Sequence, residues 1–164
     1  MSRTLVEQYR RWFEYEQDAH RKTLQSITSC AESLKETEGH QKAVDLFAHV
    51  LAARSMWLYR FGVSTEPAEL FPRQVALNEL PPRLEAMETA WLAYLETLTD
   101  ADLQQEFEYR SYDGGKFRNT IEDILTQLFG HSWYHRGQIA QLCRSIGGEP
   151  AVTDFVYWSR VSLQ

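Results

Sequence analysis

The sequence predicts an all-α protein, a four-helix bundle with a small β-hairpin inserted before the last helix. Three observations predict it: long segments whose apolar residues recur at three- and four-residue steps, glycine and proline pairs that separate these segments, and one short stretch of apolar–polar alternation. The 164 residues suffice for one sizeable core, so we expect one domain over residues 1–164.

The first helix is expected from about Thr4 to Leu34. Its apolar positions recur as one helical face requires; they are Leu5, Tyr9, Phe13, Leu24, Ile27, Ala31 and Leu34. Gly39 and His40 are expected to mark the break that follows, which would place His40 at the surface. A second helix is predicted from about Gln41 to Phe61, with Gly62 as the residue that ends it.

Residues 63–79 are predicted to form a long connection, which carries Pro67 and Pro72. A loop of this length can cross the end of a bundle, so the third helix need not run antiparallel to the second. Pro81 and Pro82 open that third helix, because proline costs little in the first helical turn. Its apolar stripe consists of Leu84, Met87, Trp91, Tyr94, Leu95 and Leu98.

A β-hairpin is expected between Gln105 and Asn119. The first half alternates charged residues with aromatic or small ones, as a two-sided strand does; these residues are Glu106, Phe107, Glu108, Tyr109, Arg110 and Ser111. Asp113-Gly114-Gly115 supplies the turn that returns the chain.

The last helix is expected from Thr120 to about Ile146. Thr120 and Asp123 form a Thr-x-x-Asp pattern, in which each side chain can accept a hydrogen bond from the other residue's backbone N–H. Gly147-Gly148 ends the helix. The tail Thr153–Trp158 is too aromatic for a solvated end, so we expect it to fold back onto the helices.

Composition argues against several classes of function. The formal net charge of −6 gives no support to general nucleic-acid or anionic-membrane binding. No run approaches the roughly 18 apolar residues of a membrane span, and the N-terminus has no apolar signal core. The two cysteines, Cys30 and Cys143, lack a CxxC spacing, which argues against a disulfide framework or thiolate zinc site. We expect a cytoplasmic protein in which Cys143 is a buried structural thiol.

Two histidines lie in the apolar stripe of the last helix. At about 100° of rotation per residue, His135 lies about 40° from His131, within the arc that also holds Ile124, Leu128 and Leu142. A lone histidine in such a stripe is usually a hydrogen-bonded core residue, but two histidines one turn apart can coordinate one metal ion. Each buried imidazole needs partners for both nitrogens, and a metal ion satisfies one nitrogen of each.

A third ligand should come from another helix, and His49 is the candidate. It shares a core-facing stripe with Leu46, Ala52, Ala53 and Met56, and the two alanines leave room for a neighbouring helix. Three neutral imidazoles suit one divalent ion, Zn²⁺ or Ni²⁺ ahead of Fe²⁺ or Mn²⁺. They leave at least one coordination position for water or substrate, which is the arrangement of catalytic sites.

Two further residues are candidates for a catalytic role, His20 and Glu16, which lie one turn apart on the first helix. His20 could line the metal cavity, support a ligand or sit at an exposed edge. In a hydrolase, a general base should stand near the attacking water, and these two residues are the only candidates for it.

Three polar residues could orient a ligand imidazole by accepting its distal N–H, namely Asp45, Gln127 and Gln138. The simpler interpretation of Asp45 and Gln127 is that they lie near the helix surface. Arg136 is expected to point away from the ion, as a group of the bundle surface or of an interface.

The sequence HSWYHRGQI of residues 131–139 strongly resembles the DinB/YfiT-like family of metalloenzymes. The family pattern is a helical HxxxHRGQ followed by a glycine-containing break and an acidic–aromatic tail, matched here by Gly147–Pro150 and Thr153–Trp158. A second family feature, a helical histidine followed closely by alanine and tryptophan, is matched by His49–Trp57. The resemblance covers nearly the whole chain.

This resemblance implies that His49, His131 and His135 are the metal ligands. It also implies an up-down-down-up helix connection and often a homodimer. Relatives include metal-dependent thiol transferases that use small thiols such as bacillithiol, a mycothiol-dependent isomerase, and many members without known activity.

The first hypothesis is therefore a metal-dependent thiol S-transferase or hydrolase, which activates a thiol or water for a small-molecule substrate. The alternative is a non-catalytic, stress-related metal-binding or interaction protein. A metal-free bundle remains a third interpretation, and it requires all three histidines to be incidental.

Overall fold

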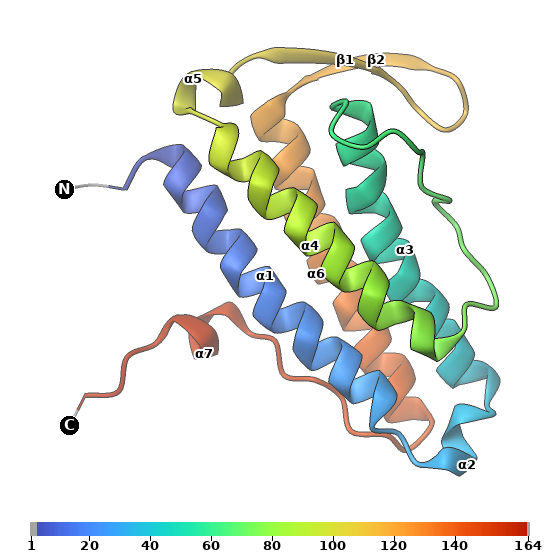
Figure 1. Ribbon diagram of the computed structural model, residues 1–164. Helices are drawn as coiled ribbons and strands as arrows, with labels where there is room; N and C mark the ends of the chain where they lie inside the picture. Colours follow the sequence, from blue (N-terminus) through green and yellow to red (C-terminus); the bar gives the residue numbers. More distant parts are fainter. Residues whose placement is uncertain (1–2, 164) are drawn as a thin grey trace.

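Four long helices lie side by side in the computed structural model, which describes residues 3–163 (Figure 1). They are α1 (Leu5–Thr28), α3 (Glu38–Arg60), α4 (Leu80–Thr97) and α6 (Ile121–Ser145). Helix α3 packs against both α4 and α6, and α1 packs against the same two helices. The chain is thus mostly helical, as the sequence predicts.

The core lies between these four helices. The predicted stripe of α4 is almost wholly buried, with Tyr94 half-buried and the others at most 6% exposed. From α1, Phe13 and Ile27 are fully buried, and each large apolar side chain of this kind contributes about 1.5–3 kcal/mol on burial. The indole of Trp91 donates a hydrogen bond to the backbone oxygen of Arg54 at 3.1 Å, so its polar atom is satisfied inside the core.

The predicted hairpin is present. Strands β1 (Glu106–Arg110) and β2 (Lys116–Thr120) pair antiparallel, with Tyr109 opposite Phe117. Gly114 has a φ of 89°, a left-handed conformation that glycine adopts without strain. The hairpin lies across the end of the helices where α3 ends and α6 begins (Figure 1). It therefore stands next to the C-terminal half of α3.

The first helix ends earlier than predicted. Helix α1 ends at Thr28, and a short helix α2 (Glu32–Lys35) precedes α3. The predicted break at Gly39 is also wrong, because Thr37 begins α3 by accepting a hydrogen bond from the backbone of its third residue. Gly39 instead serves packing, since a Cβ there would stand 2.5 Å from Cγ2 of Ile146.

His40 is buried, which contradicts the predicted surface position. Its Nε2 lies 3.0 Å from the backbone oxygen of Ile27, near the end of α1. The last carbonyl groups of a helix lack partners within the helix, so a buried histidine can bond to one of them in place of water. His40 therefore ties the start of α3 to the end of α1.

The connection between α3 and α4 runs along the outside of α3 (Figure 1). Gly62 ends α3 with a φ of 74°, as predicted, and the connection closes with the short 3₁₀ helix η1 (Leu77–Glu79). Asp45 accepts hydrogen bonds from the backbone N–H groups of Gln74 and Val75, at 3.1 and 2.9 Å. Asp45 thus holds the connection against α3.

A short helix α5 (Asp100–Leu103) follows α4. The aromatic tail folds back, as predicted, and forms a short helix α7 (Phe155–Ser159). The hydroxyl of Tyr15 donates to the backbone oxygen of Thr153, and its ring packs edge-on against Phe155 and Trp158.

Cys30 and Cys143 are both buried free thiols. Within residues 3–163, no helix has the length and apolar character that crossing a bilayer requires.

Candidate metal centre

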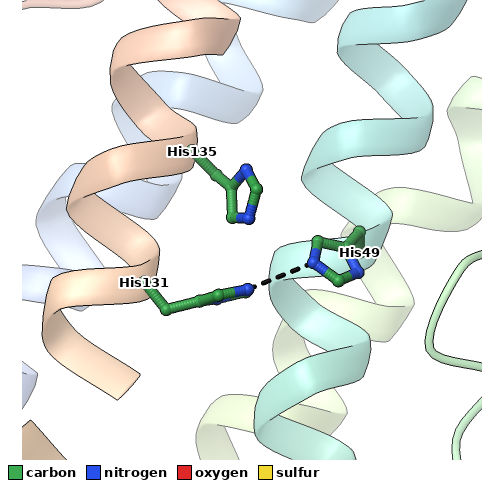
Figure 2. A group of neighbouring side chains, drawn as sticks. All are labelled: His49, His131 and His135. Atoms are coloured by element: carbon green, nitrogen blue, oxygen red, sulfur yellow. Dashed lines mark hydrogen bonds between the residues drawn. The ribbon is translucent and has the colours of Figure 1, made fainter. Parts of the chain in front are cut away.

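Three histidines from two helices converge on one point (Figure 2). His49 comes from α3, and His131 and His135 come from successive turns of α6. One ring nitrogen from each lies within 4.8 Å of the other two, and the Nε2 atoms of His49 and His131 are 3.1 Å apart. All three side chains are partly exposed, so the point at which they meet is accessible from outside.

Two of the three imidazoles are oriented by a hydrogen bond at the opposite nitrogen. His49 Nδ1 bonds to the backbone oxygen of Leu70, and His135 Nδ1 bonds to Oε1 of Gln138 at 2.7 Å. Both partners are oxygens that accept, so each Nδ1 carries the proton and each Nε2 presents a lone pair. One of the three polar residues that could orient an imidazole, Gln138, does so.

The geometry fits a metal ion better than a hydrogen-bonded histidine cluster. A single N–H on His131 Nε2 could serve only one of the two lone pairs offered by His49 and His135. One cation accepts all three lone pairs at once. Two imidazole nitrogens on a tetrahedral ion at about 2.05 Å stand about 3.3 Å apart, close to the 3.1 Å between His49 and His131.

Burial favours the neutral form of two of the three histidines, His131 and His135. Burial lowers the pKa of His131 to about 4, with further lowering from His135, His49 and Arg54. Burial also lowers the pKa of His135, against a smaller opposing effect of its bond to Gln138. Neutral imidazole is the form that binds a metal, so protons do not compete for His131 at neutral pH.

The connection between α3 and α4 completes one wall of the centre. Besides the Leu70 carbonyl, it supplies Phe71, whose ring stacks on His49 with 5.2 Å between ring centroids and 11° between planes. Tyr112 of the hairpin turn meets Phe71 edge-on at 5.6 Å. Sequence reasoning missed these contacts, because a backbone carbonyl in a loop has no residue type that marks it.

Glu16 does not belong to the histidine group. It is fully buried, and its two carboxylate oxygens pair with Arg54 and with Arg136, the latter at 3.0 Å. Arg136 also donates to the hydroxyl of Tyr15. The predicted surface or interface position of Arg136 is therefore wrong, because the Glu16 carboxylate supplies the counter-charge that a buried guanidinium needs.

His20 is likewise buried and outside the histidine group. Neither of its ring nitrogens has a hydrogen-bond partner among residues 3–163, and its Nδ1 lies 3.9 Å from Oε1 of Glu88. Burial, together with the charge of Arg136, lowers its pKa to about 3. Gln127 is exposed, as its simpler interpretation predicts.

Comparison with known proteins places the chain in a family. The DinB family matches residues 1–161. A solved DinB-like protein from Bacillus cereus shares the fold, with a TM-score of 0.67 and 20% identity over 93% of this chain and 99% of that chain. No curated protein matches the sequence. The match along nearly the full length, together with the histidine pattern, shows that the chain belongs to the DinB family.

Proposed function

We propose that the protein is a metal-dependent enzyme whose single divalent ion is held by His49, His131 and His135. The observation that carries the proposal is the convergence of three imidazoles, two of which have their Nδ1 proton committed to an oxygen. Such a centre supplies an open coordination position at which a thiol or water loses its proton more readily. An imidazole-only set suits Zn²⁺ or Ni²⁺, and also accepts Fe²⁺ or Mn²⁺.

Thiol transfer is supported over hydrolysis by the positions of the two predicted bases, Glu16 and His20. Among residues 3–163, the group that could hold the ion contains only histidines. Neither predicted base belongs to this group, because Glu16 has both oxygens committed to arginines and His20 is buried elsewhere in the helices. Hydrolysis commonly also uses a base near the attacking water, whereas a thiol bound at a cation needs only to lose its proton. A small thiol and a small electrophile are therefore the substrates we propose.

Turnover of a thiol with an electrophile tests this function. Metal-loaded protein is incubated with bacillithiol or glutathione and a chlorinated or epoxide compound, and loss of free thiol is followed. We expect turnover with the loaded protein, and none with protein stripped by chelator or with His131→Ala. If the loaded protein turns over none of these pairs, the non-catalytic metal-binding alternative is favoured. Equal turnover before and after metal removal would contradict the proposal.

Gln138 is expected to orient His135. Replacing it with leucine removes the acceptor for His135 Nδ1–H, so we expect metal affinity to fall by about 10–100-fold. Gln138→Glu keeps an acceptor oxygen and should retain most of the affinity. The matched control is Gln127→Leu, an exposed position on the same helix. Competition with a chelating dye measures the affinities, and unchanged affinity in Gln138→Leu would show that the bond is dispensable.

Three finer features accompany this proposal and stay predictions. They are the up-down-down-up connection of a four-helix bundle, the homodimer, and the cytoplasmic location. The packing of α1, α3, α4 and α6 on one another supports the first.

A further inference from the structure

A groove of about 350 Å³ lies beside the metal centre, between α3, the connection that follows it, and the β-hairpin. This volume lies within the range of small-molecule sites, whose walls are mostly apolar with a few polar groups. Its lining is largely aromatic and aliphatic; it includes Met56, Arg60, Leu70, Phe107, Tyr109 and Tyr112. A larger hollow of about 550 Å³ is formed by hairpin residues alone. None of the three histidines lines either space, but the groove includes Leu70, whose carbonyl oxygen bonds to His49.

The groove continues from the metal centre along one face of α3. At about 100° per residue, Met56 and Arg60 each lie within about 20° of His49 around the helix axis. The opposite wall is shared as well, because Leu70 lines the groove and its carbonyl oxygen bonds to His49. Tyr112 lines the groove and also contacts Phe71, which stacks on His49. A molecule bound in the groove can therefore contact both Arg60 and the metal centre.

Arg60 gives the far end of the groove a positive charge. Its guanidinium lies over the rings of Trp57 and Tyr109, 4.5 and 5.2 Å from their centroids, and the side chain is half-buried. Within residues 3–163, the Arg60 side chain makes no hydrogen bond or ion pair. The acidic residue of the groove, Glu108, is exposed. Arg110, the other arginine of the groove, donates to Gly114 within its own turn.

We propose that the groove binds an elongated, mostly apolar organic acid, whose carboxylate pairs with Arg60 while its other end reaches the three histidines. The identity of the reacting end rests on the proposed function. A guanidinium packed against two aromatic rings keeps its N–H donors in position for a carboxylate. Arg60 lies eleven positions after His49, which is about 16.5 Å along the helix axis. A long acid therefore matches this separation better than a short one.

Binding of three thiols to the zinc-loaded protein tests the proposal by calorimetry. Mercaptoundecanoate is long and anionic, mercaptoundecanol is its neutral counterpart, and thioglycolate is anionic but short. We expect the long acid to bind about tenfold or more tightly than the alcohol, which corresponds to about 1.4 kcal/mol. Arg60→Gln should remove this preference and leave thioglycolate unaffected. Arg60→Lys should keep part of it, because the charge remains.

Arg118→Gln is the matched control, since Arg118 is an exposed arginine of the hairpin that pairs with Glu106 and does not line the groove. It should keep the full preference. Equal binding of the long acid and the alcohol to the wild-type protein would overturn the proposal. So would a preference that survives Arg60→Gln, in a variant whose circular dichroism matches that of the wild type.

Undecanoate, which lacks a thiol, separates this inference from the proposed function. We expect it to bind the metal-free protein in an Arg60-dependent way, because the groove and its guanidinium do not need the ion. Failure of the protein to bind zinc, with Arg60-dependent undecanoate binding retained, would overturn the metal function and leave the acid site standing. Zinc binding without Arg60-dependent binding of either long acid would overturn the acid site alone.

Discussion

Glu16→Gln is expected to lower the free energy of unfolding by about 3–5 kcal/mol, because it breaks a buried charge cluster. Glu16 is fully buried, and its partners Arg54 and Arg136 are 1% and 4% exposed. Removing this carboxylate leaves two buried guanidinium groups without the acid that pairs with them directly. Burial already lowers the pKa of Arg54 to about 9, with Arg136 as the second cause. The two arginines would then repel each other, with the more distant Glu88 as the remaining negative charge that acts on Arg54.

Urea unfolding followed by circular dichroism measures this loss. Glu38→Gln is the control, since Glu38 forms an exposed pair with Lys42 on the surface of α3 and such pairs contribute little. We expect its unfolding curve to match that of the wild type. If Glu16→Gln is as stable as the wild type, the cluster is not the counter-charge arrangement that the contacts indicate.

His131→Ala is expected to abolish stoichiometric metal binding. The variant removes one of three converging nitrogens, and the two that remain come from different helices. We expect the same result for His49→Ala and His135→Ala, and loss of thiol turnover together with the metal. Metal content after dialysis, measured by elemental analysis, checks this expectation.

Two histidines of the same chain provide matched controls for these variants. His20 and His40 are buried in the helices but lie outside the histidine group. His20→Gln and His40→Gln should therefore keep the metal, provided that circular dichroism shows them folded. Loss of metal in either folded control, to the extent seen in His131→Ala, would show that the ligand set is wrong.

The parts of this structure that could be predicted from sequence are those with local signals. The α4 stripe is buried as its spacing indicates, and Thr120 with Asp123 begins α6. The pairing of His131 and His135 on one face follows from helix geometry alone. A residue such as Gln138 could be named as a possible partner because it lies one turn further along the same face.

The parts that could not be predicted depend on contacts between distant segments. Arg136 is buried because Glu16, 120 residues away in sequence, meets it, and nothing near either residue marks that contact. An arginine without a visible partner is most often exposed. The burial of His40 is unpredictable for the same reason, because its partner is the backbone oxygen of Ile27. Arg60 is a candidate because the hairpin and the connection lie beside α3, and no residue near Arg60 in sequence marks that arrangement.

Elemental analysis of untagged protein, purified without a nickel column, tests the central claim most directly. After incubation with Zn²⁺ or Ni²⁺ and dialysis, we expect one divalent ion per chain in the wild type and in His20→Gln, and none in His131→Ala. The expectation follows from the three imidazole nitrogens that converge within 4.8 Å. A folded wild-type protein that retains no ion, or a His131→Ala variant that retains as much as the wild type, would contradict the account.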